Sequence, residues 1–502
     1  MDTLDGSSWD VVISGTGLPQ SLLALALSRS DRTVLHVDRN DYYGSDEAAF
    51  SLSEAEAWAE RHAGTEKAEN SSFSHAAVTK AAQGEDGEAA QLSHARAYSV
   101  ALAPQLIYSR SNLLPALVSS KTHGQLDFQA VGSWFVVHKT SGQTELTRVP
   151  GGREDIFQDG ALDLKAKRSL MKFLRFVANF EEQQDTWRED SGKPFSAFLS
   201  EKFGLPLASH APILALTLSS RPLADTTVES ALPRIAGYLR GIGLFGPGFG
   251  ALLPKWGGLA EIGQVACRAG AVGGAVYVLN KGIADVQHDD EFNLTLRLGG
   301  SEKVTSKWLA GTQQELPGAS PTPESGSKTS LVSRSIAIVS STLGSLFPLT
   351  SEGGVTPAGA VVLIEPSHDA EPPVHILAHS SESGECPAGQ CVLYASVAQA
   401  PESGFDRLDH AIKEFLSSTR EEPKPAVLWC MKYQQRYASS PSTPQRTGPL
   451  LVLHNLSSDL ALEDSVLEDV KAAWQQITND DETTFMKFEA REGTAEDEET
   501  FE

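Results

Sequence analysis

The clearest indication of the fold class is the segment Trp9-Asp-Val-Val-Ile-Ser-Gly-Thr-Gly-Leu-Pro-Gln20. Its first six residues are typical of a buried strand, the two glycines of a tight turn, and the proline of the first turn of a helix. A second apolar run, Thr33–Val37, predicts another strand and is followed by Asp38. This strand–helix–strand unit with a carboxylate after its second strand has the layout of a dinucleotide fingerprint. We therefore predict an α/β domain built on a parallel sheet.

The fingerprint is degenerate at its third position. Gln20 stands where a Gly or Ala lets the helix pack closely on the strand beneath it. Two interpretations of Gly15, Gly17 and Asp38 are open on these residues alone. They form a working flavin site in which Asp38 binds a ribose hydroxyl, or they form a turn kept for packing in which Asp38 caps a helix.

Composition and charge exclude several classes of protein. The 502 residues are 40% hydrophobic and 21% charged, which is typical of a folded chain of two to four domains. The formal net charge of -24 argues against nucleic acid or an anionic lipid surface as the main partner, because either would be repelled on average. Four cysteines favour a reduced, cytoplasmic compartment. The acidic start and the lack of a run of about 18 apolar residues predict neither a signal peptide nor a membrane span.

A helical domain is predicted inside the α/β domain. Over residues 149–240 the apolar spacing changes from a period of two to one of 3.6. One stripe lies at i, i+3, i+4 and i+7 and consists of Leu170, Phe173, Leu174 and Val177. Residues 1–148 and 241–478 then form one discontinuous α/β domain.

Three segments are predicted to lie outside the folded core. Residues 51–95 and about 311–330 are rich in small, polar and acidic residues, which is typical of solvated insertions. Residues 479–502 contain ten acidic and two basic residues and are predicted to be a disordered acidic tail.

Catalytic motifs are not found in the sequence. It contains no phosphate loop, no nucleophile elbow and no His-Glu-x-x-His helix. His375 and His379 would share one face of a strand, but no carboxylate is close to them in the sequence, so no metal site is predicted. Cys267 lies in a helical pattern and is interpreted as a core residue rather than a nucleophile. No catalytic residue is predicted.

Several blocks of the sequence resemble the family that comprises Rab GDP-dissociation inhibitors and Rab escort proteins. The blocks are Val11–Gln20, Val34–Gly44, Leu126–Phe128, Val149–Pro150, Lys172–Phe180, Gly258–Gln264 and Gly273–Lys281. They occur in order and with compatible spacing. The resemblance implies a flavoprotein-like fold that holds no flavin, in agreement with Gln20, together with an inserted helical domain. It also implies a non-catalytic accessory protein for small GTPases.

The resemblance further implies a binding platform for GDP-bound Rab on the α/β domain. Carried over position by position, its residues would be Tyr43, Glu261, Arg268 and Val278. An aromatic ring with directional charged groups is a usual hot-spot composition. Spacing alone would favour ordinary structural roles for each residue. The family's Gly-Glu-Leu-Pro-Gln also appears here as Ala260-Glu-Ile-Gly-Gln264, so contact details are expected to differ.

Lipid and transferase are the other partners that the resemblance implies. A twenty-carbon geranylgeranyl chain exposed to water drives membrane binding or aggregation, so the helical domain would shelter it in a groove. Gly-Thr-Gly-Leu-Pro at the first turn and the acidic insertions favour the escort branch, which presents new Rab to the two-subunit geranylgeranyl transferase and delivers it to membranes. The helix over residues 165–180 would then dock the transferase, with Phe176 as a contact.

Two alternatives remain open. A plain dissociation inhibitor would bind only lipid-bearing Rab. A flavin-dependent oxidoreductase would hold FAD with Gly15, Gly17 and Asp38. The expected location is cytoplasmic, with transient membrane contact.

Overall fold

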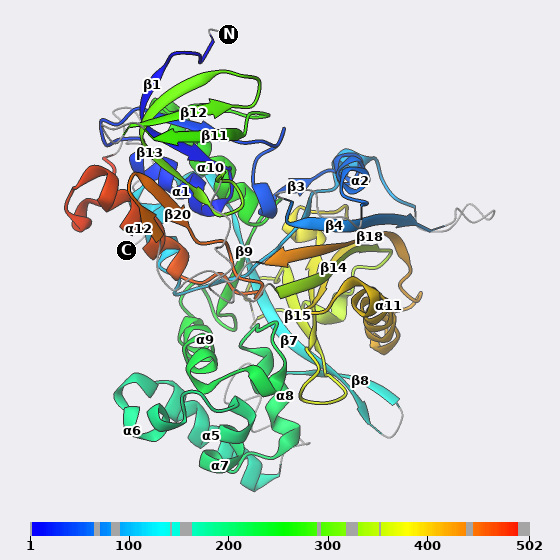
Figure 1. Ribbon diagram of the computed structural model, residues 1–502. Helices are drawn as coiled ribbons and strands as arrows, with labels where there is room; N and C mark the ends of the chain where they lie inside the picture. The colour runs from blue at the N-terminus through cyan, green and yellow to red at the C-terminus, as the bar shows by residue number, and fades with distance from the viewer. Residues whose placement is uncertain are drawn as a thin grey trace.

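The computed structural model describes most of the chain. The described residues are 3–64, 71–81, 91–140, 143–150, 163–288, 293–317, 330–350, 353–437 and 445–489. They form two large β-sheets, a small two-stranded sheet of β3 (Ala49–Phe50) and β5 (Val100–Ala101), helices that cover the large sheets, and a group of helices at one end of the molecule (Figure 1).

The first sheet starts with the unit that the sequence predicts. Strand β1 (Ser8–Ser14), helix α1 (Leu18–Leu27) and strand β2 (Val34–Val37) follow one another, and β1 pairs with β2 in parallel. Strand β10 (Val276–Val278) extends the sheet beyond β2, and β13 (Lys303–Thr312) pairs with β1 on its other side, both in parallel. β2 and the second half of β1 are fully buried, which explains their continuous apolar sequence. The predicted α/β domain with a parallel sheet is confirmed.

Shorter strands and three helices complete this part of the molecule. Its further strands are β11 (Ile283–His288), β12 (Leu294–Leu298), β19 (Gln445–Thr447) and β20 (Leu450–Leu453). β20 is parallel to β13, whereas β11 and β12 form an antiparallel ribbon. One face of the sheet is covered by α1, by α10 (Leu259–Val272) and by α12 (Ser465–Thr478), with α1 in contact with both of the others.

The second sheet has ten strands and is mostly antiparallel. Its order is β4-β18-β14-β17-β16-β15-β7-β9-β6, with β8 paired to β7, and β15 is parallel to β7. The bounds are β4 Phe73–Lys80, β6 Ile107–Tyr108, β7 Phe128–Thr140, β8 Gln143–Arg148, β9 Ala251–Pro254, β14 Ser330–Val339, β15 Gly359–Ile364, β16 Val374–Ser380, β17 Cys391–Val397 and β18 Val427–Tyr437. Helix α11 (Pro401–Ser418) packs on one face. The described parts of residues 1–148 and 241–478, which the sequence predicts to be one discontinuous α/β domain, thus contain both large sheets.

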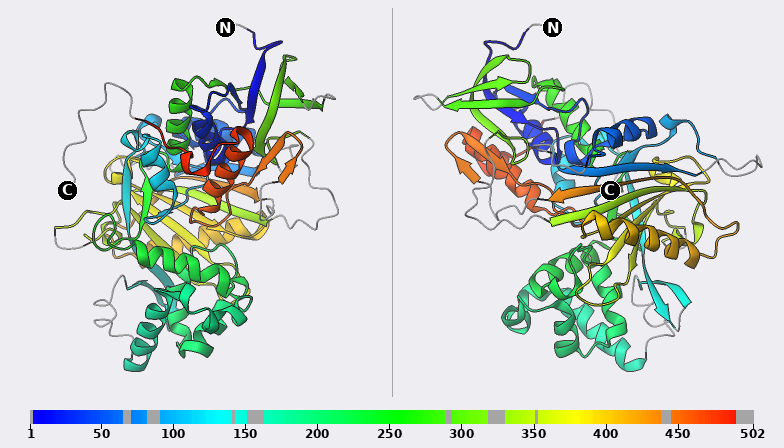
Figure 2. Two further views of the ribbon diagram at one scale, coloured as in Figure 1. Left: turned by 90° about the vertical axis from the view of Figure 1, so that its left-hand side faces the viewer. Right: turned by 45° about the vertical axis from the view of Figure 1, so that its right-hand side comes forward.

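The helical domain lies at the end of the molecule opposite the N-terminus, and Figure 2 shows it in two further views. Its helices are α5 (Leu164–Val177), α6 (Gln184–Trp187), α7 (Phe195–Phe203), α8 (His210–Ala215) and α9 (Val228–Gly241). Its core is a cluster of five rings, Phe173, Phe176, Phe195, Phe198 and Phe203. Val149, the first residue of the predicted domain, instead belongs to the β7–β8 hairpin, where its N–H donates to the carbonyl of Trp134 at 2.7 Å.

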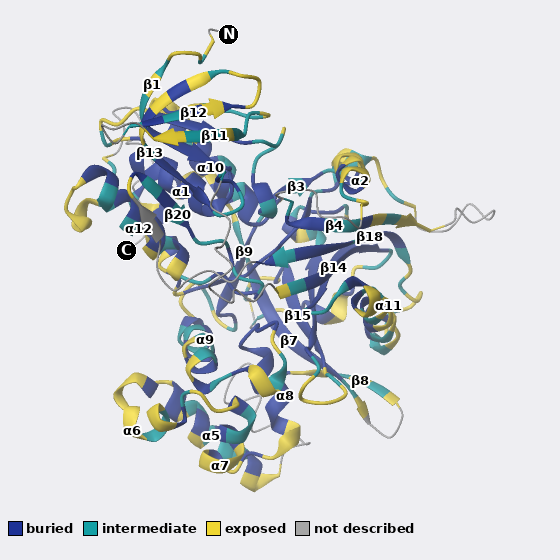
Figure 3. Cartoon of the chain, in the orientation of Figure 1, coloured by how far each residue is buried: buried dark blue, intermediate teal, exposed yellow. Residues whose placement is uncertain are grey.

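The first predicted insertion, residues 51–95, is only partly solvated. Helix α2 (Leu52–Arg61) and strand β4 lie in it, and both contain buried as well as exposed residues (Figure 3). Trp58 of α2 is completely buried. The Trp58 ring packs edge-on against Phe73 at 5.0 Å and Tyr433 at 5.3 Å. The segment is polar in overall composition, but its few apolar residues on α2 lie on one face of the helix, and that face is buried. Residues 65–70 and 82–90 lie outside the described part.

The second predicted insertion and the predicted tail also differ from the structure at their first residues. Strand β13 runs to Thr312, and Leu316 is buried, so the second insertion does not begin at residue 311. Residues 318–329 lie outside the described part. In the predicted tail, Met486 is 1% exposed, and Phe485 lies 5.5 Å from Trp474. The chain is therefore folded as far as residue 489, and residues 490–502 lie outside the described part.

Among the helices that the structure describes, none combines the length and the apolarity needed to cross a bilayer.

Candidate functional site

The turn between β1 and α1 has the geometry of a dinucleotide-binding turn. Gly15 adopts a φ of +87°, which favours glycine, and its N–H donates to the carbonyl of Val37 at 2.8 Å. Nε2 of His36, in β2, lies 2.5 Å from the carbonyl oxygen of Gly15. Burial lowers the pKa of His36 to about 4, so this ring is neutral at physiological pH. The turn is thus fixed from beneath by β2.

Asp38 binds the protein itself. Its Oδ2 accepts from the Thr16 N–H at 2.7 Å, from the Thr16 hydroxyl at 2.6 Å and from the Ser45 hydroxyl at 3.1 Å. Its Oδ1 accepts from the Asn40 N–H at 2.7 Å. The residue is fully buried. Asp38 therefore caps the β1–α1 turn, and its acceptor positions are taken by the chain rather than open to a ribose hydroxyl.

The N-terminus of α1 is also bound by the chain. Glu47 Oε2 accepts from the Leu18 N–H at 3.2 Å, in the position where a fold of this kind binds phosphate oxygens. A β-carbon at Gly17 would lie 3.0 Å from Gln20 Oε1 and 3.1 Å from Glu47 Oε2. At Gly15 it would lie 2.8 Å from Cγ of Glu315. Side chains thus fill the space beside both glycines.

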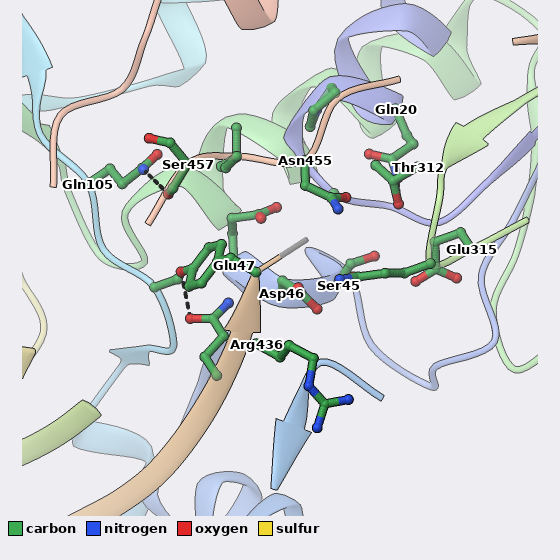
Figure 4. Close-up of a pocket in the computed structure, with 17 residues that line it drawn as sticks. Gln20, Ser45, Asp46, Glu47, Gln105, Thr312, Glu315, Arg436, Asn455 and Ser457 are labelled. Carbon is green, nitrogen blue, oxygen red and sulfur yellow. Dashed lines mark hydrogen bonds between the residues drawn. The ribbon is translucent and has the colours of Figure 1, made fainter. Parts of the chain in front are cut away.

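A small acidic cavity remains next to this turn. Figure 4 shows Asp46, Glu47 and Glu315 around it, together with Gln20 and other polar residues. It encloses about 30 Å³, enough for a water molecule, whereas ligand sites usually enclose several hundred. Burial, together with Asp46, raises the pKa of Glu47 to about 8. Burial raises that of Glu315 to about 7 against the pull of Arg39, which lies 3.1 Å away. These residues do not fit a dinucleotide.

Three of the four predicted platform residues lie on or beside α10. Glu261 and Arg268 are two turns apart on this helix, Glu261 half-buried and Arg268 exposed. Arg268 Nη1 donates to Gln125 Oε1 at 3.5 Å. Burial raises the pKa of Glu261, and Arg268 acts against that rise. Tyr43 is half-buried, and burial raises the pKa of its hydroxyl, with a further contribution from Cys267 of the same helix.

Val278 does not join these three side chains. In β10, Tyr277 packs with the core that contains α10, whereas Val278 packs with the core on the other face of the sheet. A β-carbon at Gly270 would lie 2.4 Å from Tyr277 Oη, so the glycine makes room for this ring against α10. Sequence reasoning missed Tyr277, although its position next to Val278 in a strand indicates the opposite face.

Cys267 and Phe176 are both buried. The Cys267 thiol lies 3.4 Å from the Ser21 hydroxyl, and burial raises its pKa to about 11, which agrees with a core residue rather than a nucleophile. Phe176 is 5% exposed, with its ring 5.2 Å from that of Phe203. Phe176 is thus not a surface contact for a partner in this structure. The exposed residues of α5 next to it are Lys172 and Arg175.

The histidine pair in β16 has a carboxylate neighbour that the sequence analysis missed. Glu385, six residues after His379, accepts from its Nδ1 at 2.8 Å and from the Tyr394 hydroxyl at 3.0 Å. Within the described residues, however, no three His, Cys, Asp or Glu side chains are arranged to hold a metal ion.

The comparisons with known proteins agree with this arrangement. The chain is 32% identical over 307 residues to the Rab proteins geranylgeranyltransferase component A of Saccharomyces cerevisiae, a match that covers 61% of this chain and 48% of that protein. The chain thus spans about half the length of this curated relative.

Two solved structures show the same fold. The Rab GDI of Plasmodium falciparum has a TM-score of 0.66 at 19% identity, covering 94% of this chain and 98% of that one. A putrescine oxidase variant redesigned in cofactor binding has a TM-score of 0.55 at 14% identity, covering 94% and 100%. At such identities these likenesses concern the fold alone, and they confirm the predicted flavoprotein-like architecture.

The family assignment rests on a match over more than half of the chain. The model of the GDP dissociation inhibitor family matches residues 4–72 and 61–351. These ranges contain the β1–α1 turn, Tyr43, the helical domain and α10. The chain belongs to the GDP dissociation inhibitor family.

Proposed function

We propose that this protein is a Rab escort protein, a non-catalytic accessory component of Rab geranylgeranyltransferase. It binds newly made, GDP-bound Rab, presents it to the α/β heterodimer of the transferase, shelters the geranylgeranyl groups and delivers Rab to membranes. It acts in the cytoplasm and contacts membranes transiently. The observation that carries the proposal is that a carboxylate of the chain occupies the cofactor position at the start of α1, while the exposed Arg268 and the half-buried Tyr43 and Glu261 lie beside it.

The same observation argues against an oxidoreductase. A flavin dinucleotide needs the helix N-terminus and the acidic residue after β2, and both already bind the chain. The remaining cavity is far smaller than a cofactor. We therefore expect the purified protein to be colourless and to bind no flavin.

The platform is proposed to consist of Tyr43, Glu261 and Arg268. Together they offer a flat aromatic surface and two directional charges, which suit a polar partner surface. The Val278 side chain lies on the other face of β10, and we propose that it supports the platform by stabilising this strand. The backbone carbonyl of Val278 accepts from the Asp38 N–H at 3.0 Å.

The helical domain is proposed to take the lipid and to dock the transferase. Its interior is a cluster of phenylalanine rings, an environment in which an isoprenoid chain gains about 0.8 kcal/mol per buried methylene. The exposed side of α5, with Lys172 and Arg175, offers a polar surface for the transferase. Phe176 supports that surface from inside the domain.

A titration against Rab tests the proposal. The protein is titrated with unprenylated and geranylgeranylated Rab loaded with GDP, with GTP-loaded Rab as the control. We expect tight binding of the unprenylated GDP form and support of prenyl transfer when transferase is added. Binding of the lipid-bearing form alone would assign the chain to the dissociation inhibitors, and no binding at all would contradict the family-based function.

Arg268→Ala tests the platform itself. We expect it to weaken the binding of GDP-loaded Rab by about tenfold or more, because an arginine at the centre of an interface often dominates affinity. Arg297→Ala, which removes another exposed arginine on β12 of the same sheet, is the matched control and should bind as the wild type does. Equal effects of both substitutions would point to general charge attraction instead.

A further inference from the structure

The segment that follows β2 is hydrogen-bonded to the β1–α1 turn through Gly44 and Ser45. After Tyr43 the chain turns at Gly44, where φ is +99°, and forms a single 3₁₀ turn over Ser45–Glu47. The Gly44 N–H donates to the Thr16 hydroxyl at 3.0 Å. The Ser45 hydroxyl accepts from the Thr16 N–H at 3.1 Å. The β1–α1 turn has the geometry of a dinucleotide-binding turn, but here it binds Gly44 and Ser45 of the chain itself.

Glu47 closes the same turn from its other end. Its N–H donates to the Gly44 carbonyl at 2.8 Å, and its carboxyl accepts from the Leu18 N–H at the start of α1. The turn also lies beside α10, since a β-carbon at Gly44 would lie 3.5 Å from Cβ of Ala260, an ordinary van der Waals distance. The side chain of Glu47 therefore connects the turn to α1, while Gly44 of the same turn lies beside α10.

We propose that Glu47 is a positioning residue of the Rab platform, and that its carboxyl replaces a dinucleotide at the N-terminus of α1 and so holds Tyr43 against α10. This inference rests on the proposed function, because it gives the Tyr43–Glu261–Arg268 surface its shape. The position where a dinucleotide binds in related folds thus stabilises the protein-binding surface from inside the protein. Glu47 itself is buried and does not touch the partner.

Two substitutions separate the hydrogen bond from the bulk of the side chain. Glu47→Gln keeps the length and an oxygen that accepts from the Leu18 N–H, so GDP-loaded Rab should bind within about twofold of wild type. Glu47→Ala removes the acceptor and should weaken binding about tenfold. If the alanine variant does not fold, Glu47→Asp replaces it, because a side chain one methylene shorter does not reach the same N–H.

A double-mutant cycle shows whether Glu47 acts through Tyr43. Tyr43→Ala should weaken binding strongly, and adding Glu47→Ala should then change Kd by less than about twofold, because residues that act as a unit are not additive. Asp190→Ala is the matched control. It removes another buried carboxylate, paired with Lys193 at 2.7 Å in the helical domain, and should leave Rab affinity unchanged.

The outcomes distinguish the two proposals. Wild-type protein that fails to bind GDP-loaded Rab contradicts the proposed function. If the wild type binds and Tyr43→Ala does not, but Glu47→Ala binds normally, the positioning role alone is wrong. A loss of affinity in Asp190→Ala as large as that in Glu47→Ala, or full additivity with Tyr43→Ala, would reduce Glu47 to a general structural residue and overturn the inference.

Discussion

At the scale of single residues, side chains of this protein make the contacts that a cofactor makes in related folds. The hydroxyls of Thr16 and Ser45 donate hydrogen bonds to the Asp38 carboxylate. The Glu47 carboxyl accepts one from the Leu18 N–H, the first free N–H of α1. Since buried polar groups that already have partners gain little from a new ligand, these contacts remove the reason to bind one. These contacts also have an electrostatic consequence, because several of the groups that make them are acidic and buried.

Glu47 should make the protein less stable as pH rises. Its pKa is about 8 in the folded protein and 4.5 in a model peptide, so between these values the unfolded chain has lost the proton while the folded chain keeps it. The unfolded state then binds fewer protons, and the free energy of unfolding falls with increasing pH. In Glu47→Gln this fall between about pH 5 and pH 8 should be smaller, as measured by urea unfolding across that range. An unchanged pH dependence would contradict the raised pKa.

At the scale of elements, helix α2 and strand β4 show how a polar segment joins the core. Trp58 on α2 is held between Phe73 of β4 and Tyr433 of β18, so it connects the helix to the edge of the second sheet. Ser51 and Glu54 form a capping box at the start of the helix, with the Ser51 N–H donating to Glu54 Oε2 at 2.9 Å. The segment is therefore an integral element of the domain.

Trp58→Ala should lower the free energy of unfolding by about 3–5 kcal/mol, the usual cost of a large cavity in a core. Glu60→Ala, on the exposed side of the same helix, should change it by no more than about 0.5 kcal/mol. Denaturant unfolding of the two variants provides the comparison. A small effect of Trp58→Ala would mean that the segment folds apart from the sheet.

At the scale of the whole molecule, one strap joins the helical domain to both sheets. Residues 457–464 follow β20, and the backbone of Leu460 bonds to Leu106 and Leu218. Asp459 in this strap is buried, with its carboxylate 2.6 Å from Arg234 of α9, and it accepts from the Ser220 N–H at 2.7 Å. The strap thus sets the position of the lipid-binding part that we propose relative to the platform.

Asp459→Ala should lower the free energy of unfolding by about 1.5–3 kcal/mol, because it removes charged hydrogen bonds to Arg234 and to the Ser220 N–H, while Glu463 still pairs with the Arg234 guanidinium. Arg234→Met combined with Asp459→Leu should be much less harmful, since a hydrophobic pair of similar size is often tolerated. Calorimetry should also show whether the helical domain then unfolds in a separate transition. Equal losses in the single and double variants would indicate that packing, not the charge pair, holds the strap.

Elements whose signals are local can be predicted from the amino-acid sequence. The apolar runs, glycines and proline of residues 9–37 specify strand, turn and helix, and the 3.6-residue stripe specifies α5. Those signals lie within one or two turns of chain, where backbone geometry and side-chain periodicity act directly. Matching blocks also pointed to the family and to the surface that contains Tyr43, Glu261 and Arg268.

What fills the cofactor position, and which residues share a face, depends on contacts between elements that are distant in the sequence. Glu315 approaches Gly15 from 300 residues away in the sequence, and Glu47 reaches α1 through a turn whose path depends on Asp38 and α10. The second sheet likewise pairs β4 with β18, and β7 with β15, across long intervals of chain. Contacts of this kind arise from the packing of whole elements, and no periodicity in the sequence records them.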